Sequence, residues 1–318
     1  MSKTLALAVS ALLGVSSLCD LERGLTQHFQ DWLKANGYDS QNFARTDLTG
    51  GAYGGKASDT DTIVNTPIIF FHGNSDVAVG AGTPLAWQTG FTQSINYLLG
   101  KGYKKSEMYI TTWGDGNSMN AYTRVHSADV VLRLRKFVEA VLAYTGVPKI
   151  HIIAHSMGVT LARKVIKGGA LVDSGDVGAP LTNKVDTFVG LAGANRGLMN
   201  CYYLPAFATC GNKVGFYPGS SATSSLSDFL ADINNSPAKE GDYVFSIFST
   251  MDDLISYGDL VWGQYTSAIP GQTDQKVLTS YEYNHMGCRD KTLDLQYQAI
   301  TKHSLNQSEQ KLIIEADE

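Results

Sequence analysis

Residues 150–158 read I-H-I-I-A-H-S-M-G, and this stretch decides the fold that the sequence predicts. Its apolar start is typical of a short buried strand, and helical spacing resumes beyond Gly158. Ser156 lies between the two, where a strained strand-to-helix turn would lift its hydroxyl above the sheet. The N–H of Met157 would stand at the start of the helix, where the dipole favours developing negative charge. The stretch therefore predicts a nucleophilic serine at a strand end.

Alternating strands and helices are predicted on both sides of this turn. Apolar runs predict strands over 67–71, 108–113, 150–154, 185–191 and 243–248. Helical spacing predicts helices over 21–37, 90–99, 125–144, 159–166 and 292–301. This order indicates an α/β domain with a mostly parallel sheet and helices on both faces. In such sheets the reaction centre lies beyond the carboxyl ends of the strands.

Two segments interrupt the alternation. Residues 49–55 are rich in glycine, and without a preceding strand or a phosphate-loop lysine they predict an irregular connection. Residues 197–240 are long, rich in Ser and Gly, and aromatic. Loops of this length within a domain are usually functional. We expect residues 197–240 to form an ordered, cap-like insertion over the site.

The N-terminus predicts export. A short basic start precedes an apolar run over 4–18 that ends in small residues, as in a secretory signal peptide, and this run is too short to span a bilayer. We expect residues 1–19 to be the signal peptide, residues 20–318 to form one domain, and the protein to be extracellular.

The four cysteines agree with an oxidising compartment. Cys201 and Cys210 flank a short loop and are predicted to form a disulfide that closes it beside the catalytic cleft. Cleavage after Cys19 would leave Cys288 unpaired, whereas earlier cleavage would allow these two to bridge.

Composition and motifs exclude several classes of function. The net charge of -5, without a stripe of Lys and Arg, gives no reason to expect nucleic acid as a partner. Neither H-E-x-x-H nor a Cys/His ligand spacing appears, and no G-x-G-x-x-G opens the first strand–helix turn. We therefore expect neither a metal nor an organic cofactor.

A serine nucleophile needs a base, and the base needs an orienting carboxylate. Downstream of Ser156 the histidines are His285 and His303, and His303 lies near the polar tail and is expected to be exposed. His285 is predicted in a loop before the last helix, which makes it the candidate base. Asp252 follows the strand over 243–248 and is the preferred acid. Asp253 is a plausible alternative, although it is expected to point elsewhere.

The intermediate of acyl transfer needs two N–H donors. Met157 is predicted to supply one. The other is expected from Asn74, in the loop after the strand over 67–71, where Gly73 allows a tight turn. His72 is expected to hold this loop, and His155 to pack beside the serine.

Taken together, these residues resemble the class 2 lipases, specifically the secreted nematode-type branch of the α/β-hydrolase fold. The resemblance rests on I-I-F-F-H-G-N-S-D at 68–76, I-I-A-H-S-M-G-V-T-L-A-R-K-V at 152–165, L-A-G-A-N-R-G-L at 191–198 and Y-V-F-S-I-F-S-T-M-D-D-L-I at 243–255. A secreted bacterial polyhydroxyalkanoate depolymerase is similar through H-G-N, A-H-S-M-G-V and the Cys-Tyr-Tyr segment at 201–203. The resemblance implies the same nucleophile, acid, base and oxyanion donors as the residues themselves.

The resemblance implies a serine hydrolase of carboxylic esters, acylglycerols above all, with transient contact to a lipid interface. Polyester depolymerisation is the nearest alternative. A secreted binding protein that keeps the fold without catalysis is the alternative from another class, and it would be marked by a broken triad.

Overall fold

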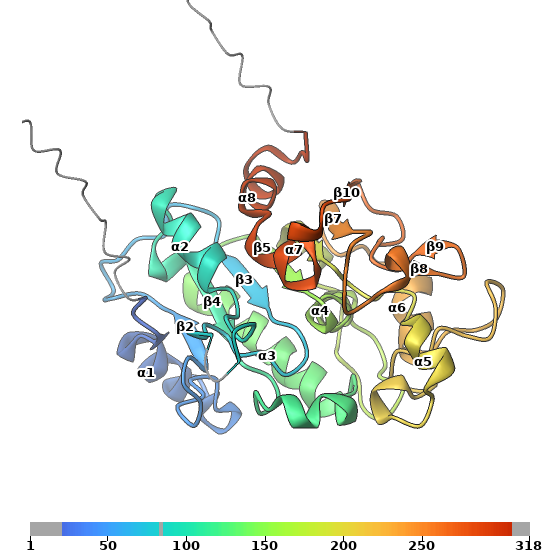
Figure 1. Cartoon of the computed structure of the whole chain (residues 1–318). Helices are drawn as coiled ribbons and strands as arrows, with labels where there is room; N and C mark the ends of the chain where they lie inside the picture. Colours follow the sequence, from blue (N-terminus) through green and yellow to red (C-terminus); the bar gives the residue numbers. More distant parts are fainter. Residues whose placement is uncertain (1–20, 83–84, 307–318) are drawn as a thin grey trace, which may run out of the picture.

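The apolar runs pair into one mixed sheet in the computed structural model, which describes residues 21–82 and 85–306 (Figure 1). Its eight strands lie in the order β1-β2-β4-β3-β5-β6-β7-β10. Their bounds are β1 Gly24–Leu25, β2 Ala52–Gly54, β3 Ile68–Phe71, β4 Met108–Thr111, β5 Ile150–His155, β6 Val185–Leu191, β7 Tyr243–Ser249 and β10 Asp274–Leu278. A separate hairpin pairs β8 (Leu260–Val261) with β9 (Gln264–Tyr265).

Parallel pairing dominates the sheet, as the alternation predicts. β5 lies between β3 and β6, and both neighbours run parallel to it. β2 pairs antiparallel to β4, so β1 and β2 run against the other strands. The carboxyl ends of β3, β5 and β7 therefore meet at one edge, where the loops carrying the candidate site residues begin.

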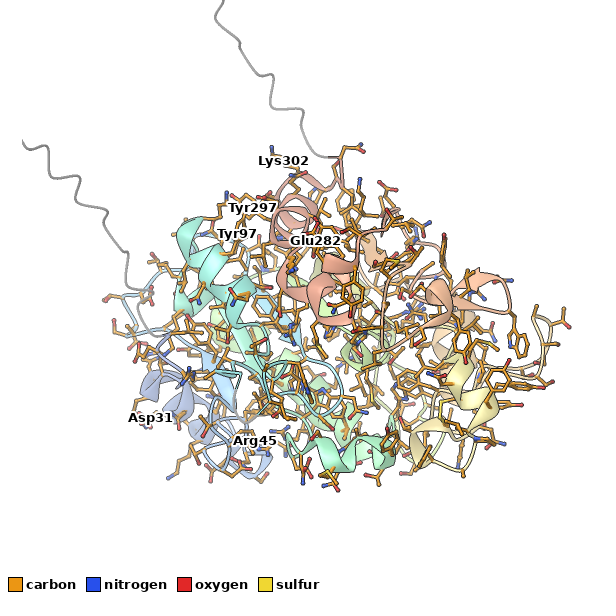
Figure 2. All side chains as sticks on the ribbon, in the orientation of Figure 1. Asp31, Arg45, Tyr97, Glu282, Tyr297 and Lys302 are labelled. Carbon is orange, nitrogen blue, oxygen red and sulfur yellow. A yellow bond between two sulfur atoms is a disulfide. The ribbon has the colours of Figure 1, made fainter. Side chains whose placement is uncertain are left out.

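Helices cover both faces of the sheet. They are α1 Gln27–Ala35, α2 Thr92–Gly100, α3 Ala128–Thr145, α4 Met157–Lys167, α5 Met199–Tyr203, α6 Asp228–Asn235, α7 His285–Asp290 and α8 Leu293–Lys302. Short 3₁₀ turns are Asp39–Gln41, Lys105–Glu107, Ser118–Thr123, Thr182–Lys184, Ala208–Cys210, Tyr257–Asp259 and Tyr281–Tyr283. Side chains of α1, α3, α4 and α6 share one apolar cluster, while α2 and α8 share another on the opposite face. In Figure 2, Tyr97 of α2 and Tyr297 of α8 face one another, with ring centroids 6.2 Å apart.

The α/β-hydrolase fold is confirmed, with differences at the edges of the sheet. The five predicted strands and five predicted helices are present, but the helix expected over 21–37 begins only at Gln27, after β1. The glycine-rich residues 49–55 contain β2 instead of an irregular connection alone. β10 has the polar sequence D-Q-K-V-L, which carries no apolar run because it lies at the edge of the sheet.

The segment 197–240 is ordered and carries α5 and α6. A hydrogen bond of 3.0 Å from the N–H of Leu198 to the carbonyl of Phe216 joins the start of this segment to its middle. The predicted Cys201–Cys210 disulfide is confirmed. That this segment caps the site stays a prediction, as does the signal peptide, which lies outside the described residues. Among the described helices, none is long and apolar enough to cross a membrane.

Candidate active site

Ser156 occupies the turn between β5 and α4 in a backbone conformation that side chains seldom adopt, with φ 55° and ψ −129°. The turn is held on both sides, because the Ser156 N–H donates to the carbonyl of Leu191 at 2.9 Å and its carbonyl accepts from Val159. A Cβ at Gly158 would collide with the carbonyl oxygen of Phe71 on β3. The sequence thus folds here into the strained turn that its small residues predict.

Asp252 and His285 come together beyond the ends of β7 and β10. Asp252 Oδ2 lies 2.7 Å from His285 Nδ1, and both side chains are almost fully buried. The other oxygen of Asp252 accepts from the N–H groups of Leu254 at 2.9 Å and Ile255 at 2.7 Å. These two bonds fix the carboxylate, so it can hold the imidazole in one orientation and leave Nε2 free for proton transfer.

His285 is the first residue of the short helix α7 and does not lie in a loop, which corrects the expectation from sequence. Asn284 caps this helix by accepting from the N–H of Gly287 at 2.9 Å. Asp253 does not point elsewhere: it accepts from the backbone N–H of His285 at 3.1 Å. Asp252 therefore orients the ring while Asp253 holds the backbone beneath it.

His155 connects the turn that carries Ser156 to the candidate base His285. Its Nε2 donates to the carbonyl of His285 at 3.0 Å, and the two rings lie 4.7 Å apart between centroids. Burial, followed by the neighbouring His285, holds the pKa of His155 well below its usual range, so this ring is neutral. Within the described ranges no hydrogen bond joins Ser156 Oγ to an imidazole. Such bonds commonly tighten only when substrate binds.

The candidate oxyanion donors belong to the two segments next to this serine. Met157 is the first residue of α4, and neither its N–H nor that of Asn74 is taken up by another group in the described part of the chain. A Cβ at Gly73 would come within 3.0 Å of Ser156 Cβ, so this loop passes directly over the serine. The Asn74 side chain is tied down through a 2.9 Å bond to the carbonyl of Ala121.

His72 holds the same loop, as expected. Its Nδ1 donates to the carbonyl of Gly73 at 2.7 Å, and its Nε2 accepts from the backbone N–H of Trp113 at 3.1 Å. Burial lowers the pKa of His72 to about 3, so it stays neutral. The ring also stacks on Trp113. His303, by contrast, is half-buried against Tyr243 and is not fully exposed.

Sequence reasoning missed the carboxyl group of Asp259. It is buried, and it accepts from the hydroxyl and the N–H of Ser267 at 2.6 and 3.1 Å. Burial raises the pKa of Asp259 to about 7, and the neighbouring charge of Asp252 adds to this shift. Its signal in the sequence is weak, because a lone Asp in a loop usually caps a turn. Cys288 is buried with a free thiol, and Cys19 lies outside the described residues.

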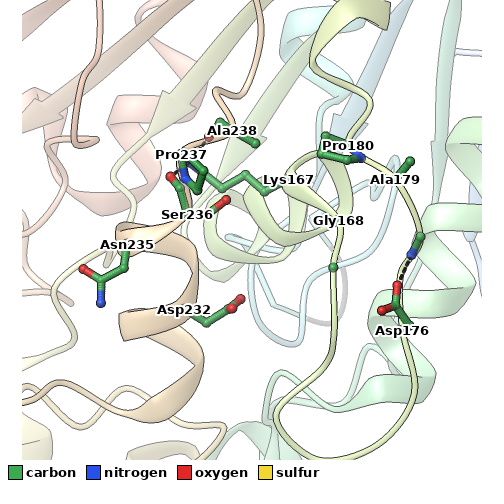
Figure 3. Close-up of a pocket in the computed structure, with 12 residues that line it drawn as sticks. Lys167, Gly168, Asp176, Ala179, Pro180, Asp232, Asn235, Ser236, Pro237 and Ala238 are labelled. Carbon is green, nitrogen blue, oxygen red and sulfur yellow. Dashed lines mark hydrogen bonds between the residues drawn. The ribbon is translucent and has the colours of Figure 1, made fainter.

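Features away from these residues do not add to the candidate site. No cluster of three or more His, Cys, Asp or Glu side chains within the described residues could hold a metal ion. A hollow of about 710 Å³ lies between the end of α4 and the end of α6 (Figure 3). Lys167 lines it, and its ammonium is already bound by the carbonyls of Ser236 and Ala238. Ser156 precedes the opposite end of α4, so this hollow is not part of the candidate site.

Comparison with protein families gives one match across most of the chain. The sequence model of the family Lipase (class 2) matches residues 65–298. That range includes every candidate residue described above, from Asn74 to His285.

Among the solved structures that the chain resembles are two lipases. Aspergillus fumigatus lipase B has 13% sequence identity and a TM-score of 0.53, over 81% of this chain. This chain spans 58% of the length of that protein. Bacillus licheniformis lipase BlEst2 in its mature form has 12% identity and a TM-score of 0.48, over 78% of this chain and 96% of its own. At these identities the first likeness concerns the fold alone.

Proposed function

Because the chain belongs to the class 2 lipase family, and so to the carboxylic ester hydrolases, we propose that it hydrolyses acylglycerols through Ser156, His285 and Asp252. The observation that carries the proposal is the buried 2.7 Å bond between Asp252 and His285, directly beside the strained turn of Ser156. A carboxylate buried against an imidazole next to a partly buried strand-end serine has the composition of an acyl-transfer site.

In the acylation step, Ser156 Oγ attacks the ester carbonyl carbon and His285 Nε2 accepts the hydroxyl proton. Asp252 stabilises the imidazolium that forms. The carbonyl oxygen becomes an oxyanion, and the N–H groups of Asn74 and Met157 donate to it at the N-terminus of α4. Each such donor is typically worth ~2.7–4 kcal/mol of transition-state stabilisation.

The remaining steps reuse the same groups. The imidazolium of His285 donates its proton to the leaving alcohol, which departs as the tetrahedral intermediate collapses to an acyl-Ser156. His285 then takes a proton from a water molecule that attacks the acyl carbonyl. A second tetrahedral intermediate releases the carboxylic acid and restores the serine hydroxyl.

The substrate class is supported by an apolar surface around these residues. Large hydrophobic side chains are exposed on the loops that carry Asp252 and His285, on the turn whose Ala121 binds Asn74, and on a segment in ring contact with these, namely Met119, Tyr122, Tyr202, Tyr203, Leu204, Phe207, Met251, Leu254, Tyr257 and Tyr281. Two of them meet across the segments, since the rings of Tyr122 and Phe207 lie 4.6 Å apart. An exposed apolar surface around a reaction centre favours a water-insoluble ester over a small soluble one.

The same surface also suits a solid polyester, so polyester depolymerisation is the second candidate. One purified preparation should be assayed on short p-nitrophenyl esters, on long-chain triacylglycerol emulsions and on polyhydroxybutyrate films. We expect the highest turnover on acylglycerols. Turnover on the films that exceeds turnover on the emulsions would transfer the proposal to polyester.

Catalysis itself is tested with a fluorophosphonate probe, which reacts with activated serines. We expect the wild-type protein to be labelled, and Ser156→Ala to be neither labelled nor active on a p-nitrophenyl ester. Wild-type turnover by Ser156→Ala would contradict the mechanism. Failure of folded wild-type protein to react with the probe would favour the non-catalytic binding protein.

We also propose that the protein is secreted after removal of residues 1–19. The apolar run over 4–18 supports this, and so does the Cys201–Cys210 disulfide, since such bonds persist in oxidising compartments. N-terminal sequencing of the protein from culture medium tests it, and retention of the intact N-terminus inside cells would contradict it.

A further inference from the structure

A buried ion pair joins the loop that carries Asn74 to the helix that carries His285. Asp76 lies two residues after Asn74, and its carboxylate contacts the guanidinium of Arg289. Arg289 lies on α7, four residues and so about one turn after His285. The side chain of Asp76 is 3% exposed and that of Arg289 is 0% exposed. The two residues are 213 positions apart in sequence.

Both partners are fixed by further bonds. The second oxygen of Asp76 accepts from the N–H groups of Val77 at 2.8 Å and Gly90 at 3.2 Å. The guanidinium of Arg289 donates to both oxygens of Asp290 at 2.7 and 2.9 Å, and to the hydroxyl of Thr89 at 2.6 Å. Arg289 is therefore held both to Asp290 on its own helix and to Thr89, the neighbour of the residue Gly90 that binds Asp76, so movement of α7 is passed to the loop of Asn74.

α7 depends on such contacts for its position. It has six residues, too few for a helix to be stable by itself. Asp252 and Asp253 hold its first residue to the loop after β7, and His155 holds that residue to the nucleophile turn. None of these three contacts reaches the loop of Asn74. The Asp76–Arg289 ion pair supplies that connection.

We propose that Asp76 and Arg289 are positioning residues that set the imidazole of His285 relative to the oxyanion donors. This inference rests on the proposed serine-hydrolase function. In the reaction Nε2 takes the proton of the hydroxyl that attacks the ester carbonyl carbon, while the N–H groups of Asn74 and Met157 bind the oxygen of that same carbonyl, so their separation must be kept closely. An error of about 1 Å in such a position can cost roughly 100-fold in rate.

Stability alone is a poor explanation for this ion pair. Removing two charges from water costs several kcal/mol per ion, and a well-packed apolar pair of similar volume is often as stable. The ion pair differs from an apolar pair in its geometry, because a guanidinium bonded to fixed acceptors allows one arrangement.

The test compares Arg289→Gln and Asp76→Asn with Arg163→Gln on a soluble p-nitrophenyl ester. Arg163 also forms a fully buried ion pair, with Glu240 at 2.8 Å, but it holds neither α7 nor the loop of Asn74. All three variants should lower the melting temperature. Activity is therefore measured well below the melting temperature of each variant. There we expect Arg289→Gln and Asp76→Asn to reduce kcat 10- to 100-fold, with KM changed by no more than about threefold. The control Arg163→Gln should keep kcat within about twofold of the wild type.

Two further variants strengthen the test. Arg289→Lys keeps the positive charge beside Asp76 and should restore part of kcat, which separates positioning from loss of bulk. The double variant Asp76→Asn/Arg289→Gln should fall no further than the worse single variant, since both remove one connection. If Arg289→Gln does not fold, Asp76→Asn and Arg289→Lys decide, because both preserve the size of the side chain closely.

The outcomes separate this inference from the proposed function. Wild-type kcat in folded Arg289→Gln or Asp76→Asn, with Ser156→Ala inactive, would overturn the positioning role and leave the serine mechanism intact. Losses of kcat as large in Arg163→Gln would also overturn it, because the effect would then follow stability. Activity retained by Ser156→Ala would instead refute the proposed function.

Discussion

The carboxylate of Asp253 accepts a hydrogen bond from the backbone N–H of His285 at 3.1 Å. Its neighbour Asp252 bonds the imidazole of the same histidine at 2.7 Å. The two adjacent acids thus have different roles at His285: the carboxylate of Asp252 orients the ring, and that of Asp253 anchors the main chain that carries it.

This division predicts unequal effects of two matched substitutions. Asp252→Asn should lower kcat by roughly 10⁴-fold, because an amide favours the wrong imidazole tautomer and cannot stabilise the imidazolium. Asp253→Asn retains an oxygen acceptor for the N–H of His285, and we expect a loss of kcat below about tenfold. Turnover of a p-nitrophenyl ester checks both. Equal losses, or a larger loss for Asp253→Asn, would contradict the assignment of the acid.

The close approach of Gly73 to Ser156 predicts that a larger residue at position 73 would crowd the nucleophile. An added Cβ would lie 3.0 Å from Ser156 Cβ and 3.3 Å from His155 Nδ1. We expect Gly73→Ala to slow labelling by a fluorophosphonate at least tenfold, since the loop must move away from the serine. Gly100→Ala is the control, because a Cβ there meets nothing within 4 Å. Unchanged labelling of Gly73→Ala would show that the loop adjusts freely.

The Cys201–Cys210 disulfide predicts a moderate effect on stability, because it closes only a short loop. The bridge joins residues nine positions apart, so the chain-entropy relation gives about 2–3 kcal/mol of free energy of unfolding. Cys201→Ser/Cys210→Ser should lose about that amount in urea unfolding, and dithiothreitol should produce the same loss in the wild type only. A double variant as stable as the wild type would mean that strain in the native loop offsets the entropy.

Asp259 predicts a pH dependence of stability. Its pKa is about 7 in the folded protein and 3.8 is the ordinary value, so between these limits the folded state holds a proton that the unfolded state releases. The stabilisation is fully present below pH 3.8 and is lost as pH rises through about 7. From pH 5 to 7 the loss is roughly 2 kcal/mol, at 1.36 kcal/mol per pH unit for one proton.

Asp259→Asn removes this titration. Its free energy of unfolding should therefore fall less than that of the wild type between pH 5 and pH 8, as measured by urea unfolding at both values. Parallel pH dependences of the two proteins would contradict the raised pKa of Asp259. The comparison cancels the contributions of other groups, which both proteins share.

Much of the fold could be predicted because the signals are local. The strand of β5 and the turn at Ser156 follow from apolar residues next to small ones, and β6 occurs over 185–191 as predicted. β10 could not be found in this way. Its side chains are exposed or half-buried at the edge of the sheet, so its pairing with β7 depends mainly on backbone bonds that most sequences can make.

The sequence by itself determined the candidates for the proposed chemistry, because a serine at a strand-to-helix turn and the acids and histidine that follow it are recognised from order and spacing. Only the tertiary structure decided what holds them. That Asp253 anchors the backbone of His285, and that Asp76 meets Arg289, could not be read from the chain. The physical reason is that such contacts join positions far apart in sequence, and they form only when the sheet brings its strand ends together.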